Sequence, residues 1–322
     1  MKKRILRLFI TLLLTTISLT ASLPVWAASC CGGGSAASLL LPKISKAMSS
    51  ASLDYESYDG YWNKEGKHND DPPGSSYKQY RLNLGYGLRI GDRWQAALSV
   101  PYIYNDNDYS SGSRNEHGLG DMAINFWYEN FDDIKCIWKV RTWEDLMPAV
   151  YFGAALTIPT GISPYDDVEA SEDITGRGFY RLDGSVLLDK TIYPWNMSLQ
   201  YTYGTHLERD VNREYGTYVP PKKKKLGDRS TATISLGYTH FFESMNTLTF
   251  TLAHSDLKED KTEIDGHSNP TTGMEKKSLA TTLAFSTMNR DWVVKATYNQ
   301  AYEGENFPKT NILSIGVTHV YR

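Results

Sequence analysis

Residues Arg81–Ile90, which read RLNLGYGLRI, give the clearest indication of the fold. Side chains of an extended chain point alternately to its two sides. One side carries the apolar residues Leu82, Leu84, Tyr86, Leu88 and Ile90, and the other carries Arg81, Asn83, Gly85, Gly87 and Arg89. Such alternation indicates a β-strand with one apolar and one polar face. The stretch also has the length of roughly 9–11 residues with which a tilted strand crosses a bilayer.

The same alternation recurs along the chain. It predicts strands at residues 52–62, 77–90, 94–105, 118–128, 147–159, 177–190, 194–208, 228–242, 246–257, 276–288, 291–303 and 309–321. Both faces of segment 147–159 are apolar, so its facing stays open.

The connections between these segments alternate in length. Gly91–Arg93 and Asn289–Asp291 are tight turns, whereas Asn63–Ser76 and Thr160–Gly176 are long polar loops. This rhythm is typical of barrels in outer membranes, and a sheet in lipid has to close because every backbone group needs a partner. The sequence therefore predicts an all-β fold, a transmembrane antiparallel up-and-down β-barrel of about 12 strands. The connection Glu129–Leu146 is long where a short turn is due, which predicts extended strands or an interfacial segment.

The composition excludes several classes of protein. The 322 residues carry 34 Lys and Arg against 37 Asp and Glu, a net charge of −3, unlike a nucleic-acid-binding protein. Beyond the N-terminus no apolar run approaches the roughly 20 residues of a membrane-spanning helix. Aromatic residues make up 12% of the chain, too many for a disordered protein. The mean hydropathy of −0.43 fits a membrane barrel, because only every second strand residue has to face lipid.

Aromatic residues gather near the ends of the predicted strands. Tyr and Trp settle at the level of the lipid headgroups, so these residues are expected to form two interfacial girdles. They are Trp62, Tyr77, Trp94, Tyr102, Tyr104, Trp127, Tyr128, Trp195, Phe241, Phe242, Trp292, Tyr302 and Tyr321.

The N-terminus predicts export to the bacterial outer membrane. Residues 1–27 have the pattern of a signal peptide, with basic residues before the mostly apolar stretch Leu8–Leu23 and small residues before a cleavage site after Ala27. We expect three parts: the signal peptide at 1–27, a periplasmic Cys- and Gly-containing segment at 28–50, and the barrel at 51–322. A short helix is predicted at Ser38–Ser49, to plug the lumen or lie on the membrane.

Cys30 and Cys31 are candidate lipidation or thiol sites. Ala27–Cys30 resembles a lipobox that lacks its usual Leu, and no CxxC spacing supports a metal or redox site. The remaining interpretation is a flexible tail whose thiols are exposed or pair with Cys136 or another chain. This segment motivates an alternative function, a structural or partner-binding barrel associated with a periplasmic redox or metal protein.

Four short motifs resemble one family. They are SVPY at Ser99–Tyr102, HGLGDM at His117–Met122, LTIPTG at Leu156–Gly161 and GRG at Gly176–Gly178. These motifs, with their order and spacing, resemble the porin-like outer-membrane family named for the meta-pathway of phenol degradation. The resemblance covers nearly the whole mature chain. His117 departs from the small residue usual before GLGD. The resemblance implies a transporter-type β-barrel and a transport role, and it names no solute.

The polar faces of the strands supply the candidate lumen residues. They are Arg81, Asn83, Arg89, Asp121, Asn125, Arg181, Asp183, Asp189, Gln200, Lys295 and Asn299. Asp121 lies beside glycine at a strand entry, where its carboxylate is expected to accept hydrogen bonds at a tight loop. We expect outer-membrane lipid around the barrel and passive or facilitated passage of an unidentified small solute through it.

Other classes of function have weaker support. None of the seven His residues has Ser two positions later, which is the spacing of outer-membrane phospholipases. Adjacent strand residues such as His254 and Ser255 point to opposite faces, so they do not form a catalytic pair. The sequence therefore predicts no enzyme, no cofactor, no metal and no nucleic-acid partner.

Overall fold

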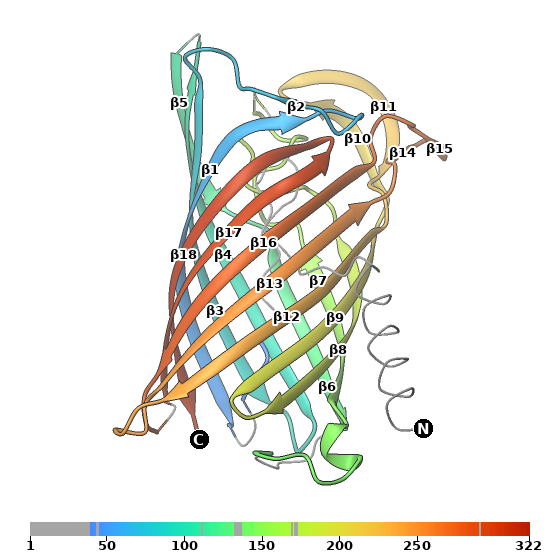
Figure 1. Cartoon of the computed structure of the whole chain (residues 1–322). Coiled ribbons are helices and arrows are strands. Elements are labelled where there is room, and N and C mark those ends of the chain that lie inside the picture. The colour runs from blue at the N-terminus through green and yellow to red at the C-terminus, as the bar shows by residue number, and fades with distance from the viewer. Residues whose placement is uncertain are drawn as a thin grey trace, which may run out of the picture.

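The chain forms a closed antiparallel β-barrel (Figure 1). The computed structural model describes residues 39–42, 45–110, 112–131, 137–168, 170, 173–289 and 291–322. Twelve long strands follow one another around the barrel. They are β1 (Ala47–Trp62), β3 (Ser76–Arg89), β4 (Trp94–Tyr109), β6 (Met122–Phe131), β7 (Ala149–Ile158), β8 (Arg181–Ile192), β9 (Trp195–His206), β12 (Arg229–Phe241), β13 (Thr247–Glu259), β16 (Met274–Ser286), β17 (Trp292–Glu305) and β18 (Phe307–Tyr321). The barrel closes where β18 pairs with β1, from Ala47 opposite Tyr321 to Trp62 opposite Phe307.

The predicted fold class and strand number are confirmed, with one barrel strand in each predicted segment. The C-terminus and most short turns lie at one rim, which we call the inner end, together with the long connection after β6 (Figure 1). The other long loops and the short turn between β17 and β18 lie at the opposite rim, the outer end. β1 begins at Ala47, four residues before the expected start of the barrel at 51. The long connection after β6 contains a short 3-10 helix, Glu144–Leu146, beside the exposed Trp138 and Trp143.

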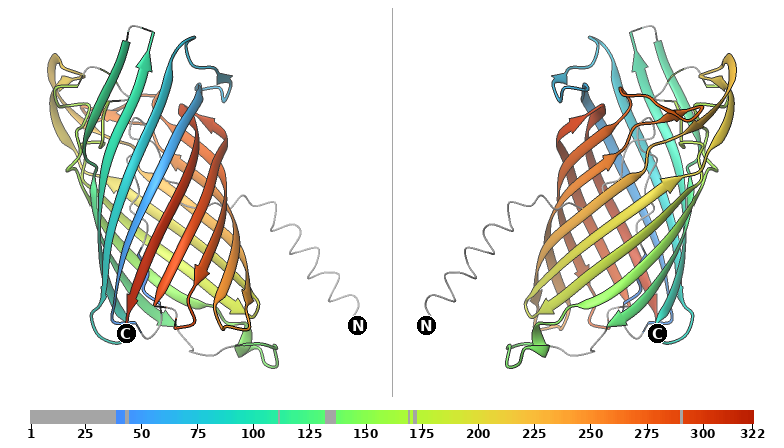
Figure 2. Two further views of the ribbon diagram at one scale, coloured as in Figure 1. Left: turned by 90° about the vertical axis from the view of Figure 1, so that its left-hand side faces the viewer. Right: turned by 90° about the vertical axis from the view of Figure 1, so that its right-hand side faces the viewer.

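The outer end carries further strands that the alternation did not predict. β5 (Gly112–Leu119) continues the pairing of β4 beyond the barrel wall, and the two form a projecting hairpin (Figure 2). The predicted segment 118–128 is therefore interrupted at Gly120 and Asp121. β2 (His68–Asn69) pairs with β1, while β10 (Arg209–Glu214), β11 (Thr217–Lys225), β14 (Glu263–Ile264) and β15 (His267–Ser268) form a separate loop sheet.

The alternation in sequence becomes an alternation of environment. Leu82, Leu84 and Leu236 are 41%, 49% and 49% exposed on the outside, whereas Arg81 and Asn83 are 0% and 8% exposed on the inside. Within the described residues no helix is long and apolar enough to cross a membrane. The outer face thus supplies an apolar band around the barrel.

Two sequence expectations are wrong. Ser38–Ser49 is not one short helix, because Leu39–Pro42 is irregular and β1 already includes Ala47–Ser49. Trp62 and Trp127 do not join a girdle: they point inward and are 5% and 3% exposed. Trp127 shares the inner face of β6 with Asn125, and the missing side chain at Gly153 leaves room for its ring, since a Cβ there would lie 2.7 Å from it.

The apolar outer band gives a direct test of membrane insertion. Leu236 lies near the middle of β12 on the outer face. We expect Leu236→Arg to lower the free energy of unfolding in lipid vesicles by about 2–4 kcal/mol, because a charge at the bilayer centre is poorly solvated. Leu236→Phe is the control. Equal midpoints of urea-induced unfolding for the two variants would contradict a lipid-facing position.

Candidate transport lumen

The eleven candidate lumen residues chosen from the sequence all lie on the inner side of the barrel wall or at its outer rim. They do not form one site. Arg81, Asn83 and Lys295 lie in the middle of the wall, and Asp121, Arg181 and Asp183 lie toward the outer end. At the inner end Arg89 lies 3.3 Å from Glu129, and Asp189 accepts a hydrogen bond from Asn196 at 3.0 Å. The others are Asn125, Gln200 and Asn299.

A central charge cluster spans β1, β3 and β16 and consists of Asp54, Glu56, Arg81 and Lys276. Arg81 donates to Glu56 at 2.8 Å and lies 3.5 Å from Asp54. All four side chains are almost completely buried. The Lys276 ammonium lies 4.3 Å from the centre of the Phe307 ring, a favourable cation–π position. These contacts fix charged groups across three strands, which narrows the lumen on this wall.

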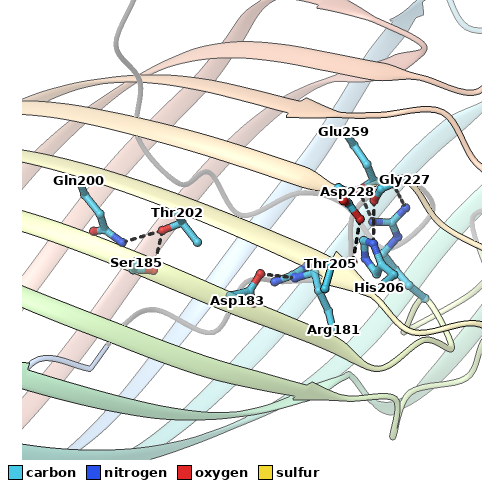
Figure 3. Close-up of polar contacts among 11 residues, drawn as sticks. Arg181, Asp183, Ser185, Gln200, Thr202, Thr205, His206, Gly227, Asp228 and Glu259 are labelled. Atoms are coloured by element: carbon cyan, nitrogen blue, oxygen red, sulfur yellow. Dashed lines mark hydrogen bonds and ion pairs between the residues drawn. The ribbon is translucent and has the colours of Figure 1, made fainter.

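The inner face from β8 to β17 is lined by hydroxyl groups. Hydrogen-bonded pairs connect neighbouring strands: Ser185 with Thr202 at 2.8 Å, Ser198 with Ser235 at 2.6 Å, Thr239 with Thr249 at 2.9 Å and Thr282 with Thr297 at 2.9 Å. Figure 3 shows the first of these pairs, with Gln200 donating to Thr202. Hydroxyl groups both donate and accept, so this wall offers uncharged polar contacts to a molecule in the lumen.

The outer loop, residues 159–180, is held inside the outer end by Asp121. The Asp121 carboxylate accepts backbone N–H groups of Gly161 at 3.1 Å and Arg177 at 2.8 Å, and it is 4% exposed. Gly176 is required here, because a Cβ would lie 2.2 Å from the carboxylate oxygen. Asp121 therefore has the acceptor role at a tight loop that its position beside glycine predicts.

Contacts with two walls hold the outer loop across the lumen entrance. On one side Asn105 donates to the backbone of Ile174 at 3.1 Å, and Asn107 donates to Asp173 at 3.3 Å. On the other side Arg177 binds Glu259 of β13 through two hydrogen bonds, at 2.5 and 2.6 Å. Because β4 and β13 belong to different parts of the wall, these contacts narrow the outer entrance.

Glu259 belongs to an outer charge cluster with Arg177, Arg181, Asp183 and Arg229. Arg181 donates to Asp183 at 2.7 Å and pairs in register with His206 of the neighbouring strand (Figure 3). Arg229 is 6% exposed on the same inner face, where it pairs in register with Glu259. Three guanidinium groups and two carboxylates therefore meet beneath the outer loop.

Residues Leu39–Pro42 lie inside the barrel at its inner end, and we call them the inner segment. Leu41 donates its backbone N–H to Gln95 at 2.7 Å. Leu39 and Leu41 are buried in one cluster with Met48, Ala97 and Val320. Gly85 and Gly87 make the room, since a Cβ there would lie 2.4 Å from Leu39 and 2.8 Å from Leu41. The inner segment thus narrows the lumen beside the wall of β1, β3 and β4.

Several charged lumen residues were missed in the sequence. Asp54 and Glu56 alternate along β1, but the weak apolar face of that segment hid the pattern. Glu259 lies two residues beyond the predicted end of its strand. Arg177 was placed at a strand start, whereas it belongs to the outer loop and only the folded chain brings it to Glu259. Cys30, Cys31 and Cys136 lie outside the described residues.

The loop sheet supplies a pH-dependent contact outside the membrane-spanning strands. Glu214 binds Lys222 at 2.9 Å and Lys224 at 2.6 Å. Burial alone would raise the pKa of Glu214, but the hydrogen bonds and charges of Lys224 and Lys222 outweigh it and hold the pKa below its ordinary value of 4.5. Lys223 and Lys225 also have carboxylate partners, Glu208 and Asp228.

This contact predicts acid sensitivity of the loop sheet. A carboxylate with a lowered folded-state pKa stabilises the fold above its unfolded-state pKa, and this contribution is lost as the pH falls through the folded-state value. The protection of the β10 and β11 amides against exchange is therefore expected to fall below pH 4.5. Glu214→Gln should remove this pH dependence. An unchanged pH dependence in Glu214→Gln would contradict this assignment.

Several solved structures are similar to this chain. An outer membrane channel from Pseudomonas putida F1 superimposes with a TM-score of 0.64 and 14% sequence identity, over 88% of this chain and 97% of that chain. The NanC porin matches with a TM-score of 0.43 and 13% identity, over 83% of this chain and 98% of that one. A Pseudomonas aeruginosa FadL homologue matches with a TM-score of 0.41 and 8% identity, over 94% and 100%.

The sequence comparisons add no family. No protein-family model matches the chain, and no curated protein matches its sequence. Among the described residues no group of three or more His, Cys, Asp or Glu is arranged to hold a metal ion. By its strand number, closure and structural likeness, the chain has the fold of an outer-membrane β-barrel.

Proposed function

We propose that this protein is a porin- or transporter-like barrel for passive or facilitated passage of small solutes across the bacterial outer membrane. The observation that carries the proposal is the contrast between the two faces of one closed sheet. The outer face is apolar along its strands, while the inner face carries hydroxyl walls and two clusters of charged residues. A polar lumen inside an apolar wall is the arrangement of membrane channels.

The two constrictions of the lumen limit the size of the solutes that can pass. The outer loop crosses one end of the lumen and the inner segment lies in the other, so the proposed solutes are small. A barrel with this strand number lies between filled eight-stranded barrels and open porins of 16–18 strands. We also propose that the chain belongs to the meta-pathway phenol-degradation family, is exported by its N-terminal signal peptide and has no enzymatic role.

Reconstitution tests the proposal. The mature protein, inserted into planar bilayers, is expected to produce discrete conductance steps, and proteoliposomes are expected to take up small solutes faster than empty liposomes. A heat-denatured sample of the same preparation is the control. A correctly folded protein that produces neither conductance nor uptake would refute a channel function.

A further inference from the structure

The lumen contains a cavity of about 260 Å³ directly above the inner segment. By the volume of liquid water it has room for about nine water molecules, and so for a small organic solute. It lies on the wall formed by β17, β18, β1, β3 and β4. Its polar lining includes Ser52, Asp54, Asn83, Ser99, Lys295, Thr297 and Ser314, and its apolar lining includes Leu39, Leu40 and Met48.

Lys295 is the distinctive group of this cavity. Its side chain is exposed to the lumen, and within the described part of the chain no hydrogen bond or ion pair engages its ammonium group. The neighbouring carboxylate is already engaged, because Asp54 accepts a hydrogen bond from Asn83 at 2.8 Å and lies 3.5 Å from Arg81. Arg81 in turn binds Glu56.

Lys295 differs from the other cations of this wall in its accessibility. Arg81 and Lys276 are fully buried, whereas Lys295 is exposed to the cavity. A charged group that faces a membrane-spanning lumen and makes no hydrogen bond or ion pair among the described residues indicates a solute position.

The other side of the cavity selects for shape. Leu39, Leu40 and Met48 lie where the inner segment meets β1, and hydroxyl groups of Ser52, Thr297 and Ser314 surround the polar part. A ligand that satisfies both parts carries one anionic group and a short apolar body.

We propose that this cavity binds small amphipathic monocarboxylates, with the carboxylate on Lys295 and the apolar body against the inner segment. This inference rests on the proposed channel function and names its solute class. Lys295 contributes the charge, the hydroxyl groups hydrogen-bond the carboxylate, and the inner segment limits the length of the apolar body.

Equilibrium binding to the full mature chain in detergent micelles tests the site. The probes are hexanoate and hexylammonium, which share an apolar body and differ in the sign of their charge. Wild-type protein is expected to bind hexanoate and not hexylammonium. Lys295→Gln should weaken hexanoate binding by about tenfold to a hundredfold, the effect of losing a hydrogen bond to a charged group. Lys295→Arg should largely retain binding.

Lys277→Gln is the matched control, because it removes the same charge as Lys295→Gln. Lys277 lies on the outer face of β16, away from the cavity. Equal affinity of wild-type protein for both probes, or no affinity for either, would overturn the proposal even if Lys295→Gln does not fold. So would equal hexanoate affinity in folded Lys295→Gln and Lys277→Gln. The channel function fails separately, when reconstituted wild-type protein neither conducts nor transports any solute.

Discussion

Arg177→Met is expected to release the outer loop. The substitution leaves the Glu259 carboxylate, 3% exposed, without its two hydrogen bonds from Arg177. Breaking a buried ion pair by removing one partner costs about 3–5 kcal/mol. Amide exchange at Thr175 and Gly176, whose N–H groups bind Ile162 in the closed loop, should therefore accelerate by at least about a hundredfold. The conductance should rise, because the loop no longer crosses the entrance.

A double variant separates the loss of the pair from the loss of Arg177 itself. Replacing both charges by apolar side chains of similar size is often neutral. Arg177→Met/Glu259→Met is therefore expected to restore most of the exchange protection that either single variant loses. If the single variants keep wild-type protection and conductance, the pair does not hold the outer loop.

The second large effect concerns the inner segment. Burial of a leucine side chain stabilises by about 1.5–3 kcal/mol, so Leu39→Ser/Leu41→Ser should remove most of what holds the segment in the lumen. The single-channel conductance is expected to increase. Gly87→Leu should act in the same direction from the opposing wall, because a Cβ at that position already lies 2.8 Å from Leu41.

Met245→Ser is the control for this experiment. Met245 lies in the short turn between β12 and β13, is 55% exposed, and belongs to none of the contacts of the inner segment. Its conductance should equal that of the wild type. An unchanged conductance in both Leu39→Ser/Leu41→Ser and Gly87→Leu would show that the inner segment does not limit the passage.

The inward or outward direction of strand residues was predictable from period-two alternation. In Arg81–Ile90 the pattern places Leu82 and Leu84 outside and Arg81 and Asn83 inside, as the structure has them. Trp127 was misassigned because it was judged by its nearness to a strand end and not by this alternation. Its parity with Asn125 already placed it inside, and the space at Gly153 accommodates it.

Partners across the lumen were not predictable in the same way. Asp121 binds residues about 40 and 56 positions later, and Arg177 binds Glu259 82 positions later. Local periodicity carries no information on such distances, because they depend on the closure of the sheet and on the path of a loop. Whether Lys295 has a carboxylate partner depends in the same way on the folded chain, because Asp54 and Glu56 of β1 pair with Arg81 of β3.

Alternation within the strands and the rhythm of short and long connections were enough to predict a closed barrel, because every backbone group in lipid needs a hydrogen-bond partner. Alternation is a local property, so it can be recognised in each strand separately. The constrictions and the cavity could be found only in the folded chain. They arise where the inner segment enters a space left by Gly85 and Gly87, and where the outer loop reaches a charge on a distant strand. Both depend on contacts between residues that are remote in sequence, and these exist only once the barrel has closed.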